Sequence, residues 1–188
     1  MRIGIIAEDD GDVAVLSILA ARMVRSKAVG FDRFIGRGAG KLRRKCGAWA
    51  DILVRKGCQW VVVAHDRDAN NEGELRKQLE CAIKGCGAKA SIVLIPVREL
   101  EAWLLFDSMA IARAFRSNKR PRLPGSPESL ADPKHALEQI VWKAFRQHYV
   151  STIHNERIAR QLDVKYLNGA RSFRAYPPFV ERIRATLR

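Results

Sequence analysis

Acidic side chains gather at three places in this sequence, each just after a short apolar run. The runs are residues 2–7, 60–64 and 91–97. Carboxylates in such positions suit Mg²⁺, a hard cation that takes oxygen ligands and keeps several waters for a substrate phosphate. Such an ion can activate water and stabilise the charge that develops during phosphoryl transfer. The acids are Glu8, Asp9, Asp10 and Asp12, then Asp66 and Asp68, then Glu99 and Glu101.

The spacing within each group predicts which acids act together. In an extended chain side chains alternate, so Asp66 and Asp68 should point to one side and Arg67 away. If a helix begins near Asp9 or Asp10, Glu8 precedes it and Asp12 lies one turn along, close enough to share an ion. The expected metal ligands are Glu8, Asp12, Asp66, Asp68 and Glu101.

Several of these acids also have a purely structural interpretation. Acids at helix starts are ordinary N-caps that interact well with the helix dipole, and we favour this role for Asp9 and Asp10. Glu101 could equally begin a helix. His65 is either a proton shuttle beside Asp66 or a satisfied, partly buried histidine.

The apolar pattern predicts the elements that position the acids. Strands are expected at residues 2–7, 30–35, 60–64 and 91–97, alternating with helical patterns that carry Val13, Leu42 and Leu75. Four such cycles with short joints predict an α/β fold, a four-stranded parallel Rossmann-like sheet flanked by helices. In such sheets ligands bind at the carboxyl ends of the strands.

The second half of the chain differs in composition. Residues 116–134 are rich in basic residues, serine and proline, and helical patterns follow them. We therefore predict a catalytic domain at residues 1–115, a basic Pro-rich linker or loop at 116–134, and a small C-terminal helical subdomain at 135–188.

Charge indicates the partner. With 34 Lys and Arg against 20 Asp and Glu, the formal net charge is +14, which favours a polyanion such as nucleic acid. An anionic membrane surface is the rival, but no run reaches the roughly 18 apolar residues of a membrane span. Because the N-terminus does not read as a signal peptide, we expect a cytoplasmic protein.

Basic residues concentrate in two stretches that could contact phosphates. Residues 36–41 lack the glycine spacing and the Ser or Thr of a nucleotide-binding P-loop, so we do not expect ATP binding. A solvated helix face is the alternative. The four tryptophans occupy apolar positions and are expected in the core. The nucleic-acid-binding candidates are Arg37, Lys41, Arg43, Arg44 and Lys45, then Lys119, Arg120 and Arg122.

The acid pattern resembles the TOPRIM domain of topoisomerases, primases, small ribonucleases and OLD-type nucleases. Its hallmark is an acid after the first strand and D-x-D after the third, here Glu8 and Asp66-Arg67-Asp68. Residues 66–74, DRDANNEGE, are similar to the topoisomerase motif D-x-D-x-E-G-E with two residues added. The resemblance covers about residues 2–107. In OLD-type nucleases a second acid follows the first by four residues, as Asp12 follows Glu8, and this implies two metal ions.

Other features narrow the resemblance. Residues 95–107, IPVRELEAWLLFD, look like a segment of an uncharacterised bacterial TOPRIM-like family associated with phage defence. Asp9 replaces the glycine that commonly follows the first acid, and the lysine-containing variant of the motif is missing, which argues against the primase and small-ribonuclease branches. The chain is also short for a topoisomerase tyrosine domain.

These features lead to the hypothesis of a Mg²⁺-dependent nuclease, with Mn²⁺ as a substitute, acting on DNA or RNA as an effector of a bacterial anti-phage system. Glu8, Asp66 and Asp68 would hold the principal ion, and Lys41 would steady the scissile phosphate. One alternative is a non-catalytic nucleic-acid-binding subunit of an ATPase complex, with a partner of ABC or SMC type. The other is a receiver-like signalling module, which needs a lysine after a fifth strand. Whether the chain forms an oligomer stays open.

Overall fold

The structure is a computed structural model that describes residues 1–26 and 28–187. Its first half alternates strands and helices, as the apolar pattern predicts. Each strand follows its predecessor after one helix, which is the connection that parallel strands require. The elements are β1 (Arg2–Ala7), α1 (Asp10–Val24), β2 (Gly30–Ile35), α2 (Ala39–Arg55), β3 (Cys58–Ala64), α3 (Glu72–Ile83) and β4 (Ala90–Leu94).

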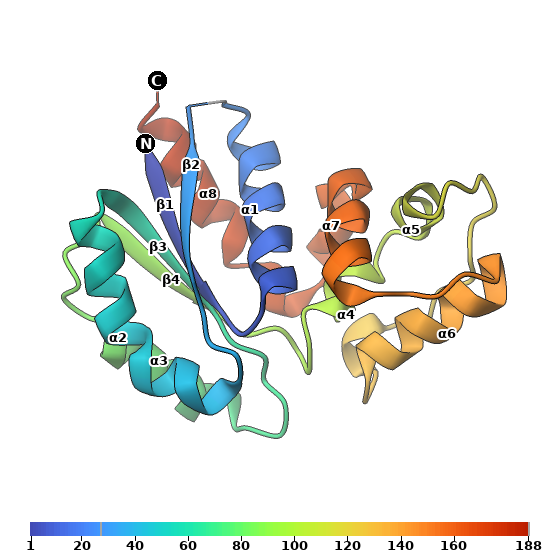
Figure 1. Cartoon of the computed structure of the whole chain (residues 1–188), viewed down its shortest axis with the longest axis horizontal. Coiled ribbons are helices and arrows are strands. Elements are labelled where there is room, and N and C mark those ends of the chain that lie inside the picture. Colours follow the sequence, from blue (N-terminus) through green and yellow to red (C-terminus); the bar gives the residue numbers. More distant parts are fainter. Residues whose placement is uncertain (27, 188) are drawn as a thin grey trace.

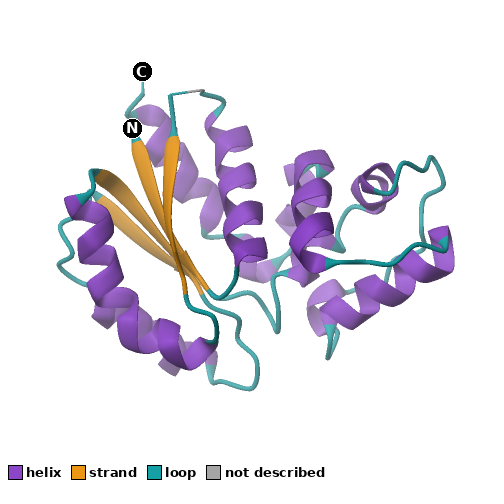
Figure 2. Cartoon of the chain, viewed as in Figure 1, coloured by secondary structure: helices purple, strands orange, loops and turns teal. Residues whose placement is uncertain are grey.

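The four strands form one parallel sheet in the order β2-β1-β3-β4, shown in orange in Figure 2. Ile6 of β1 pairs with Phe34 of β2 and with Val63 of β3. The α/β fold class and the parallel sheet are therefore confirmed. Because all strands run the same way, the loops that follow β1, β3 and β4 emerge at one edge of the sheet.

Helices cover both faces of the sheet (Figure 1). On one face Ile5, Val62 and Leu94 join a core with α1 and with the C-terminal helix α8 (Tyr176–Ala185). On the other face Ile6 and Val63 pack against α2 and α3. Gly47 lets α2 approach α3 closely, since a Cβ there would lie 2.5 Å from the carbonyl oxygen of Ala82.

The second half of the chain is helical apart from its loops. Its elements are α4 (Glu101–Leu104), α5 (Ser108–Ala114), α6 (Pro133–Phe145), α7 (Ser151–Gln161) and α8, with short 3₁₀ turns at Pro127–Ser129, Val164–Gly169 and Arg171–Phe173. The turn at Pro127–Ser129 is anchored, because the Glu128 carboxylate accepts hydrogen bonds from the backbone N–H groups of Arg171 (2.7 Å) and Ser172 (3.0 Å).

The larger apolar core contains residues from both sides of the boundaries at 115/116 and 134/135 that the composition suggests. Ile158 of α7 and Ile183 of α8 belong to the same buried cluster as Ile5 of β1. The hydroxyl of Tyr176 donates a hydrogen bond to the carbonyl oxygen of Leu16 over 2.9 Å, which ties α8 to α1. The helical C-terminal segment therefore completes the cover of the sheet.

The tryptophan prediction is confirmed for Trp60 and Trp103, which are buried, and is wrong for Trp142, whose exposed fraction is 46%. Helix α6 buries the face that carries Leu137 and Val141. Trp142 follows Val141 directly and is therefore turned about 100° around the helix, toward solvent.

None of the helices in the described part of the chain combines the length and the apolar character needed to cross a membrane.

Candidate active site

The acids after β1 and β3 lie together at the carboxyl edge of the sheet. These strands are neighbours, and the carboxylate of Glu8 accepts a hydrogen bond from the backbone N–H of Asp66 over 3.0 Å. His65 also faces Glu8, with its Nδ1 atom 3.0 Å from Glu8 Oε1 and 2.6 Å from the carbonyl oxygen of Asp66. The predicted meeting of Glu8 and Asp66 is present in the structure.

The environment of His65 favours an orienting role. Its side chain is buried, and both neighbours of Nδ1 are hydrogen-bond acceptors, so Nδ1 must carry the proton. Its Nε2 atom is buried without a hydrogen-bond partner among the described residues. His65 thus holds the Glu8 carboxylate in place from behind the site, and it does not face solvent as a proton shuttle would.

Asp9 and Asp12 shape the start of α1. Asp9 is the N-cap, and its carboxylate accepts a hydrogen bond from the backbone N–H of Asp12 over 2.9 Å. Asp12 returns the bond by accepting from the N–H of Asp9 over 3.3 Å, which completes a capping box. The capping role expected for Asp9 is confirmed, while Asp10 is exposed in the first turn, 3.9 Å from Arg33.

Burial and mutual repulsion make the cluster strongly disfavour negative charge. Burial raises the pKa of Asp66 from its ordinary value of 3.8 to about 10, and the charges of Asp12, Glu8, Glu101 and Asp68 add to the effect. The pKa of Asp12 is raised well above its usual range by burial and by Asp9 and Glu101. The pKa of Glu8 is raised by burial, which outweighs the opposing effect of His65. These acids influence one another through space.

The backbone at Asp68 departs from the expected extended geometry. Strand β3 ends at Ala64, and Asp68 adopts the left-handed conformation with φ 48°, which aspartate tolerates better than most residues. The expectation that Asp66 and Asp68 project side by side from an extended chain is therefore wrong, because the strand ends before the motif. Asp66 is half-buried and Asp68 is exposed. The charge of Asp68 still raises the pKa of Glu8 and of Asp66.

Glu101 is the first residue of α4 and reaches the cluster, where the loop after α6 and helix α7 hold it. Its side chain is buried, and its Oε1 atom accepts hydrogen bonds from the Asn155 amide (3.0 Å) and the Tyr149 hydroxyl (3.4 Å). The Tyr149 hydroxyl has one proton, which the carboxylate of Glu101 shares with the side-chain oxygen of Asn155 as a second acceptor. Burial and the nearby Glu101 raise the pKa of Tyr149, so its hydroxyl stays protonated and can donate.

Tyr149 and Asn155 were not predicted from the sequence. Asn155 is 2% exposed in the middle of a helix whose other residues are mostly polar, and that setting carries no signal that distinguishes it from surface asparagines. Glu99, two residues before Glu101, makes a different contact. Its carboxylate accepts a hydrogen bond from the backbone N–H of Lys134 over 3.0 Å, at the start of α6.

We expect Asn155→Ala to lower the free energy of unfolding by about 1–3 kcal/mol, because it removes a donor from a buried carboxylate. Urea denaturation monitored by circular dichroism measures the change. The matched control is Asn168→Ala, at an exposed position, which should shift stability by less than about 0.5 kcal/mol. Equal effects at the two positions would show that the hydrogen bond to Glu101 does not contribute measurably to the free energy of unfolding.

The first basic stretch lies beside the acids. The loop between β2 and α2 is hydrogen-bonded to the chain after β1, since the Arg37 N–H donates to the carbonyl oxygen of Glu8 over 2.9 Å. Arg43 donates to the side chain of Asn70 over 3.3 Å, in the loop that follows Asp68. Lys41 is exposed in the first turn of α2, as are Arg44 and Lys45 slightly further along.

The N-terminus of α2 adds to this positive region. Gly38 is its N-cap and supplies no side-chain hydrogen bond, so the first backbone N–H groups remain available to an anion. The second basic stretch lies elsewhere, in the loop before α6, and Lys119, Arg120 and Arg122 are exposed there. The structure thus brings the first stretch to the acids and leaves the second at a separate surface.

The donor set fits a divalent metal ion in chemistry. Its side-chain oxygens are all carboxylates, which suit Mg²⁺ and Mn²⁺. Within residues 1–26 and 28–187, however, no three acidic, histidine or cysteine side chains form a ready-made metal cage. Mg²⁺ commonly takes only one or two carboxylates directly and completes its shell with water and phosphate, so such a cage is not required.

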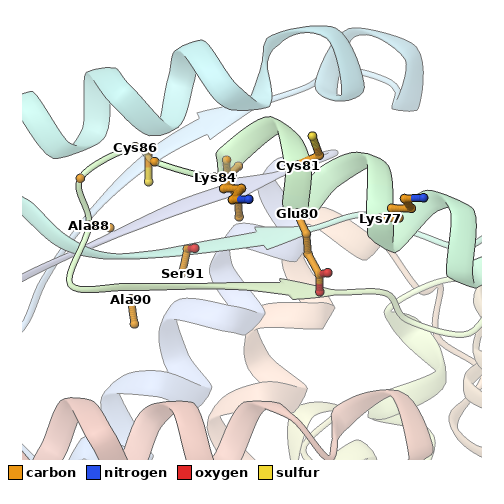
Figure 3. Close-up of a pocket in the computed structure, with 11 residues that line it drawn as sticks. Lys77, Glu80, Cys81, Lys84, Cys86, Ala88, Ala90 and Ser91 are labelled. Atoms are coloured by element: carbon orange, nitrogen blue, oxygen red, sulfur yellow. The ribbon is translucent and has the colours of Figure 1, made fainter.

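A cavity of about 710 Å³ lies away from these acids (Figure 3). It is formed by the end of α3 and the start of β4, and its lining includes Lys77, Glu80, Cys81 and Lys84. The acids follow the opposite, carboxyl ends of the strands. We therefore place the candidate site by its charged groups and not by the size of a cavity.

Comparison with known proteins identifies a family. No curated protein and no solved structure matches the chain. A family model described as a domain of unknown function, DUF4276, matches residues 15–178. The matched region contains Asp66, Asp68 and Glu101 together with Tyr149 and Asn155. Because this region spans most of the sequence, the chain belongs to the DUF4276 family.

Proposed function

We propose that this protein is a metal-dependent nuclease that hydrolyses phosphodiester bonds of DNA or RNA. One observation carries the proposal. Acids from separate elements, Glu8, Asp12 and Asp66, have pKa values raised by burial and by one another. Clustering of this kind destabilises the ionised protein unless a cation is bound, and it is typical of functional sites.

Each acid has a role in the proposal. Glu8, Asp66 and Asp68 would hold the principal ion, and Asp12 and Glu101 would help to hold a second. When bound, Mg²⁺ supplies Lewis-acid activation of water and stabilisation of negative charge on the phosphate. Tyr149 and Asn155 keep Glu101 directed at the cluster, and His65 does the same for Glu8.

The basic residues around the start of α2 would bind the substrate phosphate. Lys41 would steady the scissile group, and the uncapped N–H groups of α2 would contribute further donors. In the reaction a water molecule loses a proton as its oxygen bonds to phosphorus, the bond from phosphorus to the leaving oxygen breaks, and the leaving oxygen takes a proton. The resemblance to TOPRIM nucleases supports the same assignment. A phage-defence role and an ABC- or SMC-type ATPase partner belong to the proposal through that resemblance alone.

A non-catalytic nucleic-acid-binding subunit is the second candidate. The exposed cations Lys119, Arg120 and Arg122, which lie apart from the acids, favour it. A receiver-like module is not supported, because the described residues form one sheet of four strands, without the fifth that would present its lysine.

Metal dependence separates the two candidates. We expect the purified chain to cut end-labelled DNA or RNA with Mg²⁺ or Mn²⁺ and to stop when EDTA is added. Gel electrophoresis of single-stranded and duplex substrates measures the cleavage. Binding without cleavage in either metal would favour the non-catalytic candidate, and cleavage that persists in EDTA would exclude the metal mechanism.

A further inference from the structure

A basic cavity lies between α6 and the loop that precedes it. Its volume is about 660 Å³, and the cations on its lining are Lys119, Arg120, Arg122 and Lys143. Leu123 and Ile140 supply apolar surface between them, and no acidic residue lines the cavity. The cavity therefore combines positive charge with an apolar surface that an uncharged ring of a ligand could contact.

A smaller hollow of about 270 Å³ adjoins this cavity on α6. Gln139 lines both, and Trp142 lines the smaller one. Trp142 is 46% exposed, the His148 ring lies 5.1 Å from it, and the Arg146 guanidinium lies 6.0 Å from its centroid. We call the two hollows together the α6 groove.

The charge around the larger hollow is one-sided, whereas the smaller one also holds Glu138, whose carboxylate lies 3.6 Å from Nδ1 of His135. Residues 108–127 contain Arg113, Arg116, Lys119, Arg120 and Arg122 and no Asp or Glu. Lysine and arginine arranged in this way attract phosphate and release counterions when it binds. Pro121 lies between Arg120 and Arg122, and Pro124 follows them. Both restrict the backbone, which lowers the entropy lost when these cations are ordered on a ligand.

The exposed indole of Trp142 favours single-stranded nucleic acid over other polyanions. An accessible aromatic face beside cations stacks on bases that are not already stacked, which a single strand offers and a duplex conceals. A purely anionic protein would use the cations and add nothing to the indole, which would keep only its own neighbours His148 and Arg146.

We propose that the α6 groove binds single-stranded nucleic acid, with phosphates on Lys119, Arg120, Arg122 and Lys143 and a base stacked on Trp142. This assignment names the substrate class of the nuclease proposed above and rests on that function for the fate of the strand. Binding itself requires no metal.

The α6 groove is physically joined to the acid cluster. Helix α6 starts at Pro133, and the backbone N–H of Lys134 donates to the carboxylate of Glu99 over 3.0 Å. Glu99 lies two residues before Glu101, so the first turn of α6 is fixed to the segment that carries a candidate metal ligand. From there α6 extends away from the sheet (Figure 1).

Fluorescence anisotropy in EDTA tests the proposal, with labelled DNA and RNA strands of one sequence and the matching duplexes. We expect the parent to bind the strands more tightly than the duplexes. Trp142→Ala should weaken strand binding roughly tenfold. Arg120→Ala with Arg122→Ala should reduce the slope of log K against log salt by about 1.4, or 0.7 for each lost phosphate contact.

Two variants serve as controls. Tyr166→Ala removes another exposed aromatic residue, 48% exposed with the Lys165 amino group 5.2 Å from its ring, which lines neither hollow. It should bind like the parent. Trp142→Phe should keep most of the affinity and lose the quenching of indole emission that a stacked base causes.

The proposal is overturned if Trp142→Ala binds strands like the parent, if Tyr166→Ala weakens binding equally, or if duplexes bind as tightly as strands. Its failure is distinguishable from failure of the nuclease function, because binding is measured without metal. If the parent protein cuts in Mg²⁺ and the groove variants bind and cut as it does, only the assignment of strand binding to the α6 groove is refuted. A parent that binds through the groove and cuts nothing refutes the nuclease alone.

Discussion

Asp66→Asn is expected to lower the rate of phosphodiester cleavage in Mg²⁺ by roughly a hundredfold or more. The substitution keeps the size of the side chain and removes the charge at the centre of the cluster, where Asp12, Glu8, Glu101 and Asp68 all act on Asp66. Losing one carboxylate from a metal site removes both a ligand and part of the stabilisation of the transition state.

The matched control for this experiment is Asp51→Asn. Asp51 is an exposed acid on α2, far along the helix from its basic first turn, and its loss should leave the rate unchanged. Initial rates on an end-labelled strand at saturating Mg²⁺ give the comparison. Parent-like activity of Asp66→Asn would remove Asp66 from the catalytic assignment as a ligand of the principal ion.

The same substitution is expected to stabilise the metal-free protein. The pKa of Asp66 is 3.8 ordinarily and about 10 in the folded state, so the folded protein binds this proton more tightly than the unfolded chain. The resulting stability is fully present below pH 3.8 and is lost as the pH rises toward 10. The loss has a limiting slope of about 1.4 kcal/mol per pH unit.

Asparagine carries no such proton, so in EDTA near pH 8 we expect Asp66→Asn to exceed the parent in unfolding free energy by about 1 kcal/mol or more. The difference should shrink as the pH is lowered toward 5. Mg²⁺ should stabilise the parent and affect the variant much less, since a ligand stabilises only the state that binds it. Urea titrations across this pH range, with EDTA or with Mg²⁺, measure each effect.

An Asp66→Asn variant that is less stable than the parent at every pH without metal would contradict the repulsive cluster. The cleavage rate and the stability of Asp66→Asn also support each other. A variant that is inactive and yet more stable cannot have lost activity by unfolding, and a trade of stability for function is typical of active sites.

Much of the fold follows from local patterns. A strand buried on both faces must be apolar throughout, and β3 shows this pattern clearly from Trp60 to Ala64. The alternation of such strands with helices leads to a parallel sheet, and in a parallel sheet the carboxyl ends share one edge. For this reason the meeting of Glu8 and Asp66 could be predicted without knowing any contact.

Other features depend on contacts between distant segments. Glu101 accepts hydrogen bonds from Tyr149 and Asn155, which follow it by 48 and 54 residues. Helix α8 covers the sheet beside α1, although its sequence shows only an amphipathic helix with no indication of its partner. Periodicity identifies a buried face, but it does not specify which surface covers that face.

By itself, then, the sequence determined the order of strands and helices, the parallel sheet and the edge at which the acids collect, because these follow from local periodicity and from the geometry of parallel strands. Only the tertiary structure decided that Asp12 and Glu101 are buried, that Asp68 turns into the left-handed region and that Trp142 faces solvent. Burial and pKa depend on which groups from far along the chain approach a side chain, and that is settled only when the whole core packs.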